Sequence, residues 1–93
     1  MPRGSRESQW LVMRRCLAII RRVQRGPASG AELLRAVLED IPGAYGDAPA
    51  EAQRRKLEKD LARLWDALGL KIRSDRQAGG YVIQDSWLPL LDL

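Results

Sequence analysis

The feature that most constrains this fold is residues 50–69, where apolar and basic residues separate at helical spacing. At 3.6 residues per turn, one narrow stripe holds four leucines: Leu57, Leu61, Leu64 and Leu68. Three basic residues fall roughly opposite, flanked by Ala52 and Lys56: Arg55, Lys59 and Arg63. Burying one leucine contributes about 1.5 to 3 kcal/mol. The stretch therefore predicts one helix that buries its leucines and exposes a cationic side.

The size and residue types of the chain limit what it can do. Its 93 residues suffice for one small domain and are too few for two. Histidine is absent and Cys16 is the single cysteine, so the chain lacks the residues for an internal disulfide, a metal site of the usual nitrogen and sulfur kind, or a His-activated nucleophile. We therefore expect neither an enzyme nor a bound cofactor or metal.

The location expected for the chain is cytoplasmic. No stretch of 18 apolar residues is present, and the N-terminus lacks the apolar core of a signal peptide, so we expect neither membrane insertion nor export. A single cysteine is also compatible with a reducing compartment.

The charge of the chain is uneven. The net charge is +4, with seven arginines against one acid in residues 1–25, one arginine against five acids in residues 26–52, and eight basic residues against four acids in residues 53–78. Two basic blocks thus flank an acidic segment. This pattern favours a polyanionic partner, although basic charge alone is a weak signal.

Two more helices are predicted before the long one. Residues 8–25 place apolar side chains on one half of a helix: Trp10, Met13, Cys16, Leu17, Ile19, Ile20 and Val23. Five arginines fall on the other half: Arg14, Arg15, Arg21, Arg22 and Arg25. Gly26 and Pro27 should end this helix. Ser29 and Glu32 form a capping-box pattern, which predicts a second helix from residue 30 to about residue 39.

The remaining elements are a loop and a hairpin. Residues 41–46 carry turn residues, after which Asp47 is a candidate N-cap and Pro49 fits the first turn of the long helix. After Gly69 the helical spacing ends, and apolar and basic residues alternate as in a strand. A basic tip at residues 75–80 separates two such short strands. An isolated hairpin is marginal, so its Ile72, Tyr81 and Ile83 side should pack on the helices.

The two ends of the chain differ from this domain in composition. Residues 1–7 contain Pro, Gly, Ser and two arginines and are expected to be a flexible arm. The domain itself is expected to span residues 8–84. Residues 85–93 form an apolar tail or interdomain linker, with Trp87, Leu88, Leu90, Leu91 and Leu93. Three roles stay open for this tail: packing on the domain, a dimer contact, or a lead into a further domain.

Three helices followed by a hairpin, with the third helix basic, predict a mostly α fold, the winged helix-turn-helix, that binds double-stranded DNA. A helix fits the major groove, where Arg and Lys donate to guanine and to phosphates. The candidate contacts on the third helix are Ala52, against a thymine methyl, and Gln53, Arg54, Arg55, Lys56, Lys59 and Arg63. Arg63 is assigned to phosphate, whereas Arg54 has two alternatives, phosphate or a pair with Glu58.

In the wing, Arg73, Arg76 and Gln77 are placed near the minor groove, with Gly79 and Gly80 allowing close approach.

Other residues have structural interpretations. Glu58 and Asp60 are expected to orient basic side chains within the protein instead of acting as catalytic acids. Cys16 is expected to be a core thiol, and Trp10 and Trp65 are expected to pack at the edges of their stripes. The five arginines of the first helix fit a solvated face as well as a backbone contact or a basic rim, and the Gly79-Gly80 pair fits an ordinary turn as well as a wing.

The run of residues 51–61 (EAQRRKLEKDL), followed by LGLKI at residues 68–72 and GGYVI at residues 79–83, resembles the N-terminal winged helix of bacterial WYL-domain transcriptional regulators. The resemblance covers about residues 8–90 and implies DNA contacts from Arg55 and Lys59 and a wing at residues 76–81. Two residues differ from the family pattern. Lys56 stands where the family often has Thr or an apolar residue, and Lys59 stands where the family usually has Arg. Because Lys lacks the bidentate fork of Arg, Lys59 is expected to bind phosphate.

The same resemblance implies a DNA-reading part of a bacterial regulator associated with the nucleoid. Such regulators continue into a ligand-sensing domain and form homodimers, so residues 87–93 would begin the linker. Two alternatives remain open. The first is a winged helix that binds a protein partner through its acidic second helix and apolar tail. The second is an RNA-binding domain, although the chain lacks the paired aromatic residues on which the bases of a single strand would stack.

Overall fold

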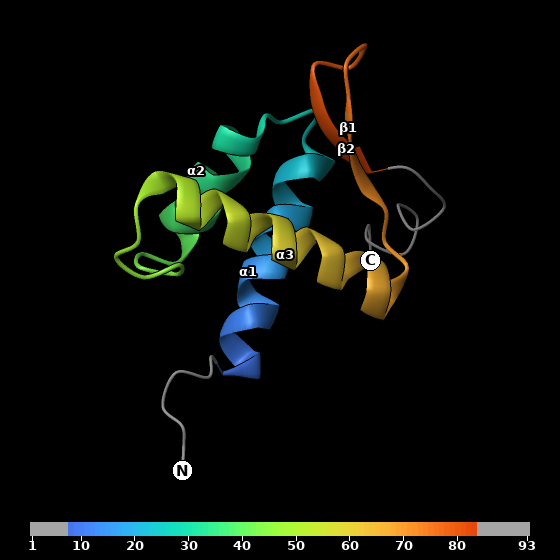
Figure 1. Cartoon of the computed structure of the whole chain (residues 1–93). Coiled ribbons are helices and arrows are strands. Elements are labelled where there is room, and N and C mark those ends of the chain that lie inside the picture. The colour runs from blue at the N-terminus through green and yellow to red at the C-terminus, as the bar shows by residue number, and fades with distance from the viewer. Residues whose placement is uncertain (1–7, 84–93) are drawn as a thin grey trace.

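The computed structural model describes residues 8–83, which form three helices followed by a two-stranded antiparallel hairpin (Figure 1). The elements are α1 (Gln9–Gln24), α2 (Gly30–Asp40), α3 (Ala50–Leu68), β1 (Ile72–Asp75) and β2 (Gly80–Ile83). This is the predicted fold class, a mostly helical winged helix layout. The predicted flexible arm at residues 1–7 and the tail at residues 85–93 lie outside the described residues.

The predicted helix ends are largely confirmed. Ser8 caps α1 by accepting a hydrogen bond from the Leu11 amide, and the capping box of α2 is complete, with the Ser29 amide donating to Glu32 (2.8 Å) and the Glu32 amide donating to Ser29 (3.0 Å). Gly69 ends α3 in the left-handed conformation, at φ 68°. The predicted Asp47 cap is wrong. Pro49, expected in the first turn, is instead the N-cap, and α3 begins one residue later; no side chain caps the helix, because proline carries no side-chain acceptor.

The core forms where the three helices and the base of the hairpin meet. Ile19 of α1, Leu33 and Val37 of α2, and Leu57 and Leu64 of α3 are almost fully buried there. Figure 1 shows α3 crossing in front of α1, with α2 beside its N-terminal half. Leu61 is half-buried, but Leu68 is 51% exposed, so the predicted leucine stripe is buried for only part of its length.

The predicted division of α1 is wrong in two respects. Met13 and Leu17 were expected on the buried side of the helix and Trp10 at its edge, but all three are exposed, Trp10 by 68%. Arg15 was expected at the surface, in a solvated face, a backbone contact or a basic rim, but its side chain is 1% exposed. The core side of α1 is rotated towards Arg15, Ile19 and Val23, and the buried residues of this helix all lie from Arg15 onward.

The hairpin packs on the helices as predicted. Ile72 pairs with Ile83 at its base, and both contact the helical core together with Tyr81, which is partly buried. A third short segment joins the hairpin: the Ala28 amide donates to the Tyr81 carbonyl (3.2 Å), and the Tyr81 amide donates to the Ala28 carbonyl (2.7 Å). This bridge was not predicted. It ties the hairpin to the connection between α1 and α2.

Gly80 makes this bridge possible, because a Cβ atom there would lie 2.6 Å from the carbonyl carbon and oxygen of Ala28. We expect Gly80→Ala to lower the free energy of unfolding by about 1 to 3 kcal/mol, the usual cost of forcing atoms into a packed site. Urea unfolding measures the change. The matched control is Ser74→Ala at an exposed position of β1, which should stay within about 0.5 kcal/mol of the parent. Equal effects of the two substitutions would contradict this role of Gly80.

Candidate nucleic-acid interface

The rotation of α3 about its axis is set by three buried residues. Leu57, Asp60 and Leu64 are spaced by three and four residues, so they lie on one side of the helix, and each is at most 2% exposed. Arg55 and Lys59 therefore lie on the outer side, one helical turn apart, and both are exposed. Within residues 8–83, neither side chain forms an ion pair or a hydrogen bond.

Asp60 is the centre of a buried polar cluster. Its carboxylate accepts two hydrogen bonds from the Arg15 guanidinium, from Nε at 2.9 Å and from Nη2 at 3.1 Å. It also accepts from the Tyr45 hydroxyl at 2.6 Å and from Nη1 of Arg63 at 2.6 Å. The predicted role of Asp60, orienting basic side chains within the protein, is thus confirmed. Glu58 is exposed and forms no ion pair within residues 8–83.

The Asp60 cluster also fixes the loop between α2 and α3. The Arg15 guanidinium lies 4.8 Å from the centroid of the Tyr45 ring and donates to the Ala44 carbonyl at 3.2 Å. Burial raises the pKa of the Tyr45 hydroxyl far above its ordinary value, and its hydrogen bond to Asp60 adds to this shift. The hydroxyl therefore stays protonated and continues to donate. The long loop is consequently held to both α1 and α3.

Three of the predicted DNA contacts are engaged within the protein. Nε2 of Gln53 donates to the carbonyls of Ala48 (2.9 Å) and Gly46 (3.3 Å), and Nζ of Lys56 donates to the Tyr45 carbonyl (3.3 Å). Arg63 pairs with Asp60, although its side chain remains 47% exposed. Gln53 and Lys56 thus brace the loop before α3.

The other two predicted contacts on α3 lie near its start. Ala52 is half-buried, and Arg54 is exposed. The Arg54 guanidinium lies against Gly30 at the start of α2, where a Cβ atom on Gly30 would come 2.5 Å from Nη2. Of the two alternatives for Arg54, the pair with Glu58 is not formed within residues 8–83.

The predicted wing contacts are presented by the hairpin. Arg73 on β1 and Arg76 and Gln77 in the turn are exposed. The carboxylate of Asp75 shapes the turn by accepting from the amides of Gln77 (2.9 Å) and Ala78 (3.3 Å). The hairpin therefore holds two guanidiniums at its outer surface without burying either.

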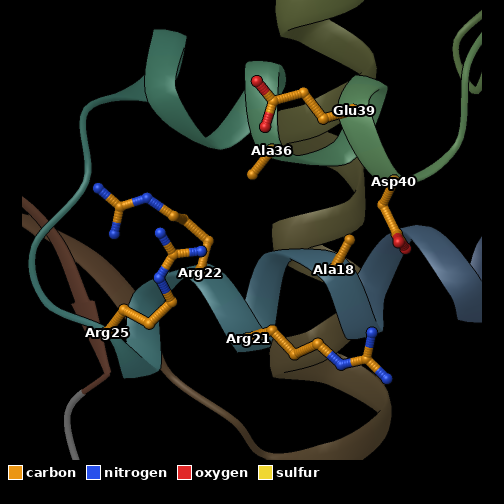
Figure 2. Close-up of a pocket in the computed structure, with 7 residues that line it drawn as sticks. All are labelled: Ala18, Arg21, Arg22, Arg25, Ala36, Glu39 and Asp40. Carbon is orange, nitrogen blue, oxygen red and sulfur yellow. The ribbon is translucent and has the colours of Figure 1, made fainter.

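The arginines of α1 are not equivalent. Figure 2 shows Arg21, Arg22 and Arg25 beside a hollow of about 270 Å³ that is bordered on α2 by Glu39 and Asp40. Arg22 donates to the Gly26 carbonyl at 3.2 Å and lies 3.8 Å from the Glu32 carboxylate. This arginine braces the end of α1. Arg15 belongs to the core, so the five arginines do not form one cationic face.

Helical periodicity carried a signal for the burial of Asp60 and Arg15, but not for the pairing between them. Asp60 lies three residues after Leu57 and four before Leu64, and Arg15 lies four residues before Ile19. Both therefore fall inside apolar stripes. Tyr45 gave a weaker signal, since an aromatic residue in a turn-rich loop needs a surface on which to pack.

Comparisons with known proteins add no relative. No protein-family model, curated protein or solved structure matches the chain. Among the helices of residues 8–83, none has the length and apolar character needed to cross a membrane.

Proposed function

We propose that this chain binds double-stranded DNA, with the N-terminal half of α3 in the major groove and the hairpin near the minor groove. The observation that carries the proposal is the pair of exposed cations Arg55 and Lys59, which lie one turn apart and have no partner within residues 8–83. Holding such side chains on a rigid helix lets them reach base edges and phosphates with little loss of entropy.

The roles of these side chains follow from their chemistry. Arg55 carries a planar fork that matches O6 and N7 of guanine, whereas Lys59 acts as a point charge towards a phosphate. Arg54, Arg73 and Arg76 are exposed and serve as further phosphate contacts. Arg63, whose side chain is partly exposed, can add another phosphate contact. Gln53 and Lys56 contribute by bracing the loop, and they contact DNA only if they leave their present carbonyl partners.

Within this proposal, the chain is the DNA-reading part of a bacterial transcriptional regulator similar to the WYL-domain regulators, working in the cytoplasm at the nucleoid. It has no enzymatic role, and a homodimer formed through a further domain would pair two half-sites. The resemblance of residues 51–61 and 79–83 supports this role, and the winged helix layout is compatible with it.

The experiment that tests the proposal selects bound duplexes from a random pool and then measures affinity for the best duplex at several salt concentrations. With about six phosphate contacts, log K should fall with log salt at a slope near −5. An RNA duplex of the same sequence is the control for nucleic-acid type. A slope near zero, or equal binding of the RNA duplex, would refute DNA recognition by α3.

The alternative is a winged helix that binds a protein partner without DNA. It is favoured by the exposed apolar side chains of α1 and α3, among them Trp10, Met13 and Trp65. In addition, α3 exposes acidic residues as well as basic ones, namely Glu51, Glu58 and Asp66. Co-purification of a partner, together with the absence of salt-dependent DNA binding, would favour this alternative.

A further inference from the structure

Five large apolar side chains of α1 and α3 are exposed instead of joining the core. Those that are exposed lie in the N-terminal part of α1 and near the C-terminal end of α3: Trp10, Met13, Leu17, Trp65 and Leu68. Between the two helices lies a hollow of about 450 Å³, which we call the α1–α3 groove. Its lining includes Met13, Cys16, Leu64, Ala67 and Leu68.

The groove continues the core without being covered by any element of residues 8–83. Leu64, at its floor, is 2% exposed, whereas Leu68, one turn further along α3, is 51% exposed. The same change occurs along α1, from buried Ile20 to exposed Met13. Contiguous apolar surface of this kind is costly in water and usually marks an interaction site.

We propose that the α1–α3 groove is the docking site for residues 84–93 of this same chain. The position of the hairpin supports this assignment. Ile83, the last residue of β2, pairs with Ile72, which follows Leu68 by four residues. The segment after Ile83 therefore starts beside the end of α3 that borders the groove.

The segment is long enough to fill the groove. Ten residues span at most about 33 to 36 Å when extended and about 15 Å when helical. The part of α1 that lines the groove, from Gln9 to Cys16, rises only about 10 Å along the helix axis. Either conformation of the segment therefore covers it.

The composition of the segment matches the groove. Half of its ten residues are large and apolar: Trp87, Leu88, Leu90, Leu91 and Leu93. Its two acids, Asp85 and Asp92, are complementary to Lys71, whose ammonium lies 5.2 Å from the centroid of the Trp65 ring. The groove lining itself carries one charge of each sign, Asp66 and the partly exposed Arg63 that pairs with Asp60. A tethered segment also acts at an effective concentration in the millimolar range, which favours it over a second copy at ordinary protein concentrations.

Cys16 offers a direct probe, because the single thiol of the chain lines the groove. The experiment measures the rate at which N-ethylmaleimide alkylates Cys16 in the full chain at fixed pH. The test variant is Leu90→Lys with Leu91→Lys, which places charge on the apolar residues of the segment. The matched control is Gln84→Lys with Ser86→Lys, which adds the same charge at polar positions of the segment. Far-UV circular dichroism and thermal melting confirm that both variants fold.

We expect the test variant to be alkylated about tenfold faster or more, the factor that corresponds to one buried leucine side chain. The control should stay within about twofold of the parent chain, as surface substitutions usually do. Equal rates for the parent and the test variant would overturn the proposal. Protection that increases with protein concentration would also overturn it, because a second copy would then cover the groove.

A double-mutant cycle separates a docked segment from a general loss of stability. The groove variant Met13→Lys should speed alkylation by itself, and adding Leu90→Lys with Leu91→Lys should then have little further effect, because the contact is already lost. If the two changes instead raise the alkylation rate by factors that multiply, the segment and the groove act independently and the proposal fails. None of these variants alters Arg55 or Lys59, so the outcome is independent of DNA binding.

Discussion

Replacing Asp60 by alanine is expected to lower the free energy of unfolding by about 3 to 5 kcal/mol, because one partner of a buried ion pair is removed. Arg15 is 1% exposed, and the substitution would take away the carboxylate that accepts two of its hydrogen bonds. The Tyr45 hydroxyl and the Arg63 guanidinium would lose the same acceptor. For a domain of this size, the loss amounts to a large fraction of the total stability.

Chemical unfolding followed by circular dichroism measures this change. Glu58→Ala is the matched control, since Glu58 is an exposed acid on the same helix, and its effect should remain within about 0.5 kcal/mol. Pairing Asp60→Leu with Arg15→Met should recover part of the loss, because apolar pairs of similar volume often replace buried ion pairs at little cost. A loss below about 1 kcal/mol for Asp60→Ala would mean that the cluster contributes little beyond an ordinary hydrogen bond.

Replacing both Arg55 and Lys59 by alanine is expected to weaken binding to the selected duplex severely while leaving the fold intact. An Arg contact to guanine contributes about 1 to 3 kcal/mol of discrimination, so Arg55→Ala should weaken binding by about 5- to 150-fold and relax specificity at one base pair. Lys59→Ala should weaken binding to all sequences evenly and reduce the salt slope by about 1. Mobility shifts at several salt concentrations measure both effects.

Arg21→Ala is the matched control for the loss of charge. Arg21 is also exposed, but it lies on α1 beside the hollow bordered by Glu39 and Asp40 (Figure 2). Its removal should change binding far less than that of Arg55. The unfolding midpoints of all three variants should match the parent, because neither Arg55 nor Lys59 is bonded within residues 8–83. Normal DNA binding by both alanine variants would refute the assignment of α3 as the reading helix.

The exposure of apolar residues at the start of α1 has a simple physical cause. Periodicity indicates which residues share a side of a helix, but it does not say how much of that side a neighbouring element covers. The apolar stripe of α1 is longer than the surface that α2, α3 and the hairpin bury, so Trp10 and Met13 remain exposed at its N-terminal end. The same applies to Leu68 at the end of α3.

The predictions for the hairpin show a similar limit. The change from helical spacing to alternation located β1 and β2, and the apolar positions indicated that Ile72 and Ile83 face the core. The bridge between Ala28 and Tyr81 was not predictable, because it joins segments more than fifty residues apart through backbone groups alone. Any non-proline residue carries those groups, so residue types give no sign of such a pairing.

Local chemistry in the sequence was sufficient to determine the three helices, the capping box at Ser29, the end of α1 just before Gly26 and the hairpin, because these features depend on residues within a few positions of one another. Only the tertiary structure decided which charges are available to a partner. It buries Asp60 with Arg15 and engages Lys56 and Gln53 with the loop, yet leaves Arg55 and Lys59 unbonded within residues 8–83. A charged side chain is exposed or buried according to partners brought from elsewhere in the chain, and those partners are set by packing.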